Sequence, residues 1–173
     1  IRSDQYQTDE KLKIRIALHT RFGTNPQPWT DWIRRQLPLF PACRVFDLGC
    51  GSGELWYADT PAPPPGMRLL LADRSMGMLG SARTALEGRG LPYLCCDALS
   101  LPCPEAAFDL VLANHLLFHL PDIPAALREI RRVLRPGGYL CATTYGQDNM
   151  AEMFDLLAEA GITFAGGASD PRL

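Results

Sequence analysis

The chain has 173 residues and a formal net charge of −2, with 47% hydrophobic and 21% charged residues. This length is typical of one domain, and this composition excludes a wholly disordered chain. The near-balanced charge argues against a broad basic surface for nucleic acid, and no apolar run approaches the ~20 residues of a membrane span.

Two helices are predicted before the first strand. Apolar residues mix with lysines and arginines from Asp9 to Gly23, and a second helical pattern covers residues 29–37. Pro28 suits the first turn of the second helix, and Pro38 ends it. Two roles fit Phe22, Trp29 and Trp32: they line an aromatic pocket over a ligand, or their helices pack against a sheet.

Five short apolar runs follow, each with the length of a buried strand, at 44–48, 68–72, 92–96, 108–113 and 139–143. Helical patterns cover 75–87 and 122–137, the second with Asp122 as its N-cap and Gly137 with Gly138 at its end. Strands that are apolar on both faces and alternate with helices indicate a mostly parallel sheet with helices on both faces. The expected fold class is therefore α/β. A last amphipathic helix is predicted at 148–160, and no pattern for further strands follows it.

The residues after each strand are candidates for a binding site, because ligands of parallel sheets bind beyond the carboxyl ends of the strands. Asp47 closes the first strand and a glycine turn follows it, while Asp73 follows the second strand. Asp97 follows the third strand, and Asn114 with His115 follows the fourth. Three carboxylates and a glycine turn are thus expected at one edge of the sheet.

The glycines of the turn stand at positions 49, 51 and 53, and Glu54 occupies the place where a dinucleotide fingerprint has its third glycine. Glycine lets the backbone approach a ligand closely. An acid at each end of this loop favours a cationic or zwitterionic ligand over a pyrophosphate.

Two of the carboxylates have the spacing expected for contacts with a nucleoside. Asp73 lies 20 residues beyond Gly53, the distance at which a carboxylate accepts hydrogen bonds from ribose hydroxyls in this kind of sheet. Asp97 can accept a hydrogen bond from the exocyclic amine of adenine, while the neighbouring backbone N–H donates to a ring nitrogen. The alternatives are a helix cap for Asp73, a helix-dipole or turn acid for Asp47, and a surface turn residue for Asp97.

Four segments together resemble the ordered motifs of class I S-adenosylmethionine-dependent methyltransferases, in particular the ubiquinone/menaquinone-biosynthesis C-methyltransferases. They are Val45–Gly53, Ala72–Leu79, Cys96–Pro102 followed by Phe108–Val111, and Arg132–Gly138. The resemblance implies a Rossmann-like sheet, S-adenosylmethionine as cofactor and methyl transfer to a small-molecule acceptor. It also implies an N-terminal helical lid at 1–40 and a cofactor-binding domain at 41–173. The sixth and seventh strands that usually end this fold have no counterpart in the sequence.

The resemblance assigns the cofactor contacts residue by residue. Asp47, Gly49, Cys50 and Gly51 belong to the loop against the methionine part, and Asn114 contacts the same end through its backbone. At the other end, Asp73 binds the ribose, Arg74 and Met78 flank the adenine, and Asp97 with Ala98 reads the adenine edge.

No general base stands out in the sequence. His115 and His119 are the candidates for a catalytic role, but Leu116, Leu117 and Phe118 lie between them, and histidines in apolar surroundings are commonly structural. Their spacing of four residues also suits a metal pair, but no third ligand is evident, so no metal site is expected.

Several wider expectations remain open. The chain begins at Ile1 without a secretory leader, and its six cysteines form no C-x-x-C pair, so we expect a cytoplasmic protein with free thiols. Arg128, Arg131, Arg132 and Arg135 suit a solvated helix face better than a groove for RNA. The alternatives to a methyltransferase are a non-enzymatic S-adenosylmethionine-binding module and a nicotinamide-dependent oxidoreductase.

Overall fold

The structure is a computed structural model that describes residues 14, 17–18, 21–57, 62–146 and 159. The predicted helix at 9–23 is described at a few helical positions, and the one at 148–160 only at residue 159. The expectation that two strands are missing after the fifth concerns residues that likewise lie almost wholly outside the described part. Within the described part, no helix is both long and apolar enough to cross a membrane.

Five parallel strands form one sheet in the order β3-β2-β1-β4-β5. The strands are β1 (Arg44–Leu48), β2 (Arg68–Asp73), β3 (Tyr93–Cys95), β4 (Phe108–Asn114) and β5 (Leu134–Thr143). From β1 the chain builds outward to β3, then crosses to the other side of β1 for β4 and β5. The topological switch therefore lies between β1 and β4. The predicted α/β fold class is confirmed.

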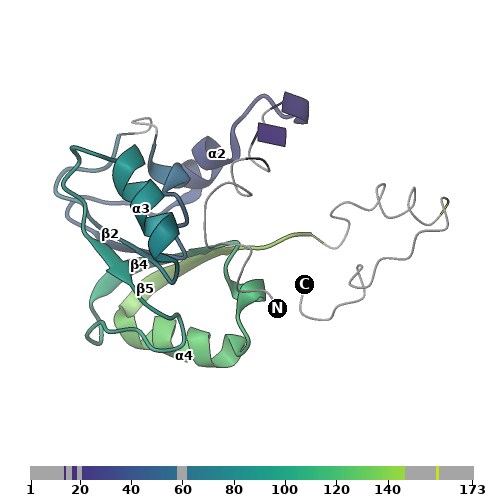
Figure 1. Ribbon diagram of the computed structural model, residues 1–173. Helices are drawn as coiled ribbons and strands as arrows, with labels where there is room; N and C mark the ends of the chain where they lie inside the picture. The colour runs from purple at the N-terminus through teal and green to yellow at the C-terminus, as the bar shows by residue number, and fades with distance from the viewer. Residues whose placement is uncertain (1–13, 15–16, 19–20, 58–61, 147–158, 160–173) are drawn as a thin grey trace.

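Helices cover both faces of the sheet (Figure 1). The α2 helix (Trp29–Gln36) and α3 (Met76–Ala85) lie on one face, and α4 (Ile123–Val133) lies on the other. Neighbouring residues of β1 serve different cores, because Val45 packs with Ile33 of α2 and Phe46 packs with Ile130 of α4. Two short 3-10 helices, η2 (Glu54–Trp56) and η3 (Leu117–His119), follow β1 and β4. All six cysteines are free.

The prediction that the fourth helix runs to Gly137 was wrong. The α4 helix ends at Val133, and β5 begins at Leu134, which pairs with Phe108. Pro136 explains the difference, since a proline disfavours helical backbone at the preceding residue. Gly137 has a φ of +76°, and the register of β5 shifts between Phe108 and Leu110. The glycines thus belong to an irregular stretch of the strand and not to a helix cap.

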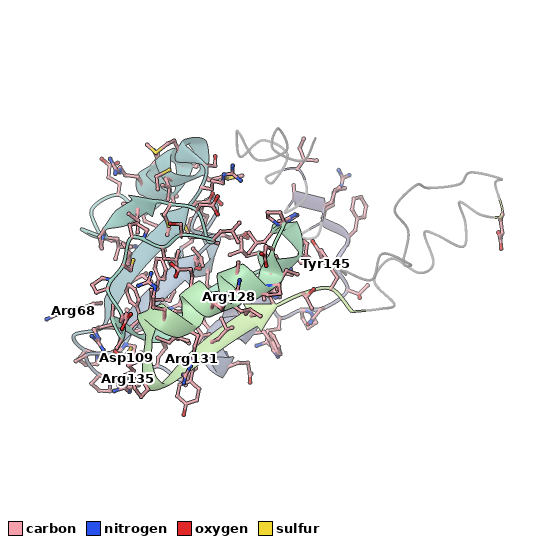
Figure 2. The ribbon with its side chains drawn as sticks, turned by 90° about the horizontal axis from the view of Figure 1, so that it is seen from below. Arg68, Asp109, Arg128, Arg131, Arg135 and Tyr145 are labelled. Atoms are coloured by element: carbon pink, nitrogen blue, oxygen red, sulfur yellow. The ribbon has the colours of Figure 1, made fainter. Side chains whose placement is uncertain are left out.

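The four arginines expected on one helix face therefore separate. Arg128 and Arg131 are exposed on α4 (Figure 2). Arg132 binds Glu129 and the backbone of the loop before β4. Arg135 lies in β5, and its Nε is 2.7 Å from Oδ1 of Asp109. Two of the four side chains are thus tied to the fold, which corrects the expectation of a continuous solvated face.

Candidate functional site

The loop after β1 has a backbone that only glycine adopts easily. Gly49, Gly51 and Gly53 have φ values of +76°, +56° and +80°, a region that strains other residues. The backbone N–H groups of Gly49 and Cys50 both donate to the carbonyl of Ala72 in β2. This loop therefore lies across the carboxyl ends of β1 and β2, with its backbone accessible at close range.

Gly49 also brings the segment after β4 near the loop. A Cβ built on Gly49 would lie 3.0 Å from Cδ1 of Leu116. The absence of a side chain thus lets the segments that follow β1 and β4 approach at the topological switch, where ligands of open parallel sheets bind.

Asp73 joins the glycine loop to the start of α3. Its Oδ2 accepts a hydrogen bond of 3.0 Å from the backbone N–H of Gly51, and its Oδ1 accepts one of 2.8 Å from Ser75. Ser75, not Asp73, is the N-cap of α3, since its Oγ accepts from the backbone N–H of Met78. Burial raises the pKa of Asp73, and the hydrogen bonds from Ser75, Gly51 and Arg74 oppose that effect. Asp73 and the loop thus meet as expected.

Asp47 lies beneath the loop and is 2% exposed. Its Oδ2 accepts a hydrogen bond of 2.7 Å from Nε1 of Trp56 in η2. Burial raises the pKa of Asp47 to about 7, the hydrogen bond from Trp56 lowers it in part, and the negative charge of Asp73 adds to the increase. The sequence predicted Asp47 at the end of the first strand, and the structure has it in β1 just before the glycine loop. Its indole partner, nine residues along the chain, was not predicted.

We call the edge of the sheet at the carboxyl ends of β1, β2 and β3 the rim. Asp97 lies there beside Asp73, because the backbone N–H of Cys96 donates to the carbonyl of Asp73. The Oδ1 of Asp97 accepts from Leu99, and its Oδ2 lies 3.9 Å from Nε of Arg74. The side chain of Asp97 is 42% exposed and that of Arg74 is 80% exposed. Both side chains are therefore open to a ligand. Asp47, Asp73 and Asp97 thus belong to the ends of three neighbouring strands.

Three other predicted cofactor contacts are partly or wholly covered. Met78 is 2% exposed and Ala98 is 6% exposed. Cys50 is half-buried, and its Sγ donates to the carbonyl of Gly51. Burial raises the pKa of the Cys50 thiol, with a further contribution from the charge of Asp47, so this thiol stays protonated and is a poor nucleophile.

The end of β4 carries the predicted Asn114 and His115. Thr143 of β5 holds both, because its Oγ1 donates to Oδ1 of Asn114 and accepts from the backbone N–H of His115. His115 has a φ of +50°, which is uncommon for a residue other than glycine and is found mostly in turns and at strained sites.

His115 packs with three aromatic rings, those of Trp29, Phe118 and Tyr145, and we call these four residues the aromatic group. The ring centroid of His115 lies 5.2 Å from those of Trp29 and Tyr145, and that of Phe118 lies 5.1 Å from Tyr145. His119, the second candidate base, packs on the outer member Phe118 at 4.4 Å. Phe118 and Tyr145 were not predicted, because they become neighbours only when β4 and β5 pair.

The opposite end of the sheet has a different character (Figure 2). Tyr145 lies at one end, while Arg68, Asp109 and Arg135 gather at the other. Asp109 is buried, and Arg44 donates to it from its backbone N–H and from its guanidinium. Because both oxygens of Asp109 are bound to Arg44 and Arg135 of the strands, we interpret this cluster as a structural contact.

As far as residue 57, where the described part of this segment ends, the loop differs from a pyrophosphate site of the dinucleotide type. It leads into η2, which has only three residues, and Gly53 precedes Glu54 at its start. A pyrophosphate site of the dinucleotide type needs the N-terminus of a full helix. The carboxylate-rich rim beside the glycine loop instead suits a nucleoside whose attached group carries positive charge.

Comparison with known proteins agrees with this geometry. Residues 46–142 match the family model described as a methyltransferase domain. The chain is 35% identical over 117 residues to demethylmenaquinone methyltransferase of Corynebacterium urealyticum, covering 68% of this chain and 48% of the relative. It is 34% identical over 123 residues to 27-O-demethylrifamycin SV methyltransferase of Amycolatopsis mediterranei, covering 64% and 42%.

Among solved structures, an S-adenosylmethionine dependent methyltransferase from Mesorhizobium loti is similar, with a TM-score of 0.59 and 30% identity. That match covers 70% of this chain and 55% of the other. The chain spans about half the length of the curated relatives it matches. The resemblance seen in the four sequence motifs is confirmed at the level of the family.

Proposed function

Because this chain belongs to the methyltransferase domain family, we propose that it binds S-adenosylmethionine at the carboxyl rim of the sheet and transfers its methyl group to a small molecule. The observation that carries the proposal is the contact between Asp73 and the glycine loop, in which the carboxylate binds the backbone of Gly51 at 3.0 Å. This contact sets a hydrogen-bond acceptor for ribose next to a backbone that a ligand can approach.

The residues of the rim fit the parts of the cofactor in order. Asp73 accepts backbone hydrogen bonds from Gly51, Ser75 and Arg74, and a carboxylate with about four acceptor sites keeps capacity for a ribose hydroxyl. Asp97 offers an exposed carboxylate for the amine of adenine, and Arg74 lies beside it. The glycine loop offers backbone groups to the methionine part, with the buried carboxyl of Asp47 beneath it.

When bound, S-adenosylmethionine supplies a methyl group that its positively charged sulfur already activates. The protein therefore needs to align the acceptor and exclude water more than to provide a covalent intermediate. The cysteine of the loop is consistent with this chemistry, because Cys50 remains a protonated thiol. Hydrogen-bond acceptors and backbone groups, not nucleophiles, make up the rim.

We place the acceptor against the aromatic group at the topological switch. Trp29, His115 and Tyr145 come from three segments, and the ring of His115 lies 5.2 Å from each of the other two. Leu116, the residue after His115, lies against Gly49 of the glycine loop. An aromatic surface of this kind binds a flat, apolar molecule well. His115 and His119 are the candidates for removing a proton from such an acceptor. The names of the two curated relatives give demethylmenaquinone and 27-O-demethylrifamycin SV as acceptors, which supports a small-molecule acceptor here.

Calorimetric titration of the full chain with S-adenosylhomocysteine tests the cofactor proposal. We expect saturable binding, and a loss of at least about tenfold in affinity for Asp73→Asn, because a neutral amide accepts weaker hydrogen bonds than a carboxylate. Asp122→Asn is the matched control, since Asp122 also accepts a backbone hydrogen bond at a helix start, on Ala125 of α4, which covers the opposite face of the sheet from α3 (Figure 1). Absence of binding, or binding of NADH in its place, would contradict the proposal.

Methyl transfer is tested separately with S-adenosylmethionine labelled on its methyl group and a panel of demethylated quinols and phenols. Appearance of label in a product supports a transferase. Binding of S-adenosylhomocysteine with no transfer to any member of the panel would favour the alternative of a non-enzymatic cofactor-binding module.

A further inference from the structure

An ion pair on α4 holds the loop that joins β3 to β4. Glu129 and Arg132 lie one turn apart on the helix, and Nη2 of Arg132 is 2.7 Å from Oε2 of Glu129. Oε2 of Glu129 also accepts a hydrogen bond of 2.8 Å from the backbone N–H of Leu101. Arg132 in turn donates to the backbone carbonyls of Leu101 and Cys103 at 2.8 and 2.7 Å. We call this pair with its three backbone contacts the loop latch.

The backbone groups that the latch binds belong to buried residues. Leu101 is 5% exposed and Cys103 is 9% exposed, and both pack in the core beside Ile130 of the same helix. The carbonyl of Arg132 adds a further contact, since it accepts from the backbone N–H of Ala106. The loop is therefore fixed to α4 through its backbone, and α4 is fixed to the sheet through its apolar face.

The same loop carries the residues proposed to read adenine. Asp97 begins a tight turn in which its carbonyl accepts from Ser100 and its Oδ1 accepts from Leu99. Leu101, the residue that the latch grips on both its N–H and its carbonyl, follows this turn directly. At its other end the turn is fixed to β2, because Cys96 donates to the carbonyl of Asp73.

We infer that Glu129 and Arg132 are positioning residues for the adenine end of the cofactor, acting through Asp97 and the backbone of Ala98. This inference rests on the proposed function. Neither side chain of the latch needs to touch the ligand. By fixing Leu101 on α4, the latch fixes the direction in which the turn presents the exposed carboxylate of Asp97 at the rim.

The charge state of the latch is stable across the range in which the protein would be assayed. The hydrogen bonds from Arg132 and from the backbone of Leu101 lower the pKa of Glu129 to about 2, and the contact with Glu129 raises the pKa of Arg132. A neutral substitution therefore removes a charge that is always present. Glu129→Gln keeps the shape of the side chain and one acceptor oxygen for the N–H of Leu101. Its second terminal atom is an amide nitrogen, so it cannot also accept from both Nε and Nη2 of Arg132, as the carboxylate does.

The test compares S-adenosylhomocysteine with S-inosylhomocysteine, in which a carbonyl replaces the exocyclic amine. We expect the unchanged chain to prefer the adenosyl compound by at least roughly tenfold, the value of one hydrogen bond to a charged group. In Glu129→Gln that preference should fall severalfold, and Arg132→Lys should show the same loss, because lysine cannot bind two carbonyls and a carboxylate in the same geometry.

Two control variants separate positioning from stability. Ile130→Val removes a buried methylene from the same helix without touching the latch, so it should lower the melting temperature and leave the preference unchanged. Arg131→Gln removes an exposed charge beside the latch and should alter neither. A preference that stays at the original value in folded Glu129→Gln and Arg132→Lys would overturn the positioning role while leaving the proposed function intact. Failure of the unchanged chain to bind either compound would instead overturn the proposed function.

Discussion

The indole of Trp56 donates its N–H to the buried carboxyl of Asp47 across 2.7 Å, directly beneath the glycine loop. This hydrogen bond joins the end of β1 to η2, so it closes the loop from below, while the contact between Asp73 and Gly51 holds the loop from β2. The carboxylate charge of Asp73 is stabilised by three backbone hydrogen bonds, and that of Asp47 by the hydrogen bond from the neutral indole of Trp56. We therefore expect the contribution of Asp47 to stability to depend on pH.

Asp47 should make folding stability fall as the pH rises. Its folded pKa of about 7 lies above the ordinary value of 3.8, so the stabilisation by the neutral carboxyl is complete below pH ~4 and is lost as the pH rises through ~7. Asp47→Asn stays neutral and should therefore gain on the parent chain by up to roughly 4 kcal/mol between pH 4 and 8. Urea unfolding at a series of pH values measures the difference. A constant difference between the two chains would contradict the prediction.

Gly53 should not tolerate a side chain. Its φ is +80°, and a Cβ there would lie 3.0 Å from Cδ1 of Leu86 and 3.3 Å from Cβ of Ala82. Gly53→Ala should destabilise the fold by about 2–4 kcal/mol, since backbone strain and overpacking add.

Two other glycines separate these causes. Gly88→Ala has the same strain, with a φ of +81° but open space around the Cβ, and should cost only about 1–2 kcal/mol. Gly80→Ala lies inside α3 with open space and should stabilise by about 0.5–1 kcal/mol. Thermal unfolding of the three variants gives the order of their stabilities. Equal losses of stability for Gly53→Ala and Gly88→Ala would exclude a steric contribution from Leu86 and Ala82 at Gly53.

Asp109 should stabilise the folded state through its contacts with Arg44 at the start of β1 and Arg135 near the start of β5. Burial raises its pKa, but the hydrogen bonds from Arg44 and the charges of Arg44 and Arg135 outweigh this effect, so the pKa of Asp109 is lowered overall. Its stabilisation is therefore present above the ordinary pKa of ~3.8 and is lost as the pH falls below it.

Asp109→Asn should cost about 1–3 kcal/mol at neutral pH, because the carboxylate also accepts from the backbone of Arg44. Arg135→Gln should cost less than about 1 kcal/mol, since that side chain is 44% exposed and Arg44 remains bound to Asp109. Denaturant titration at pH 7 checks both values. A larger loss for Arg135→Gln would show that its contact with Asp109 is not screened by solvent.

His115 should matter for methyl transfer more than for cofactor binding. His115→Asn keeps a residue that tolerates the observed φ of +50° but removes the imidazole from the aromatic group. If His115 is the base, kcat should fall by about 10²-fold or more, while the affinity for S-adenosylhomocysteine changes little. His119→Asn is the comparison, because His119 packs on the outer ring of Phe118. Equal kcat values for the parent chain and His115→Asn would remove His115 from the candidates.

The sequence alone established the local parts of this protein. The apolar runs located all five strands, with β1 predicted at its observed bounds, and the alternation of strands and helices indicated the parallel sheet. The positions of Asp47, Asp73 and Asp97 at three strand ends also followed from the sequence, because all strands of a parallel sheet end at one edge. These features depend on residues close together in the chain, and periodicity and turn chemistry report on them directly.

Only the tertiary structure decided which partners these residues have. Three contacts join segments that no local sequence pattern connects. They are the hydrogen bond from Trp56 to Asp47, the packing of Tyr145 on His115, and the hydrogen bonds from Arg132 to the carbonyls of Leu101 and Cys103. The end of α4 was also decided there, since Leu134 pairs with Phe108 in place of another helical turn. The physical reason is that these hydrogen bonds and buried contacts form only once the strands have paired. A polar side chain that the sequence pattern indicates to be solvated can then bind backbone groups that are distant in the sequence.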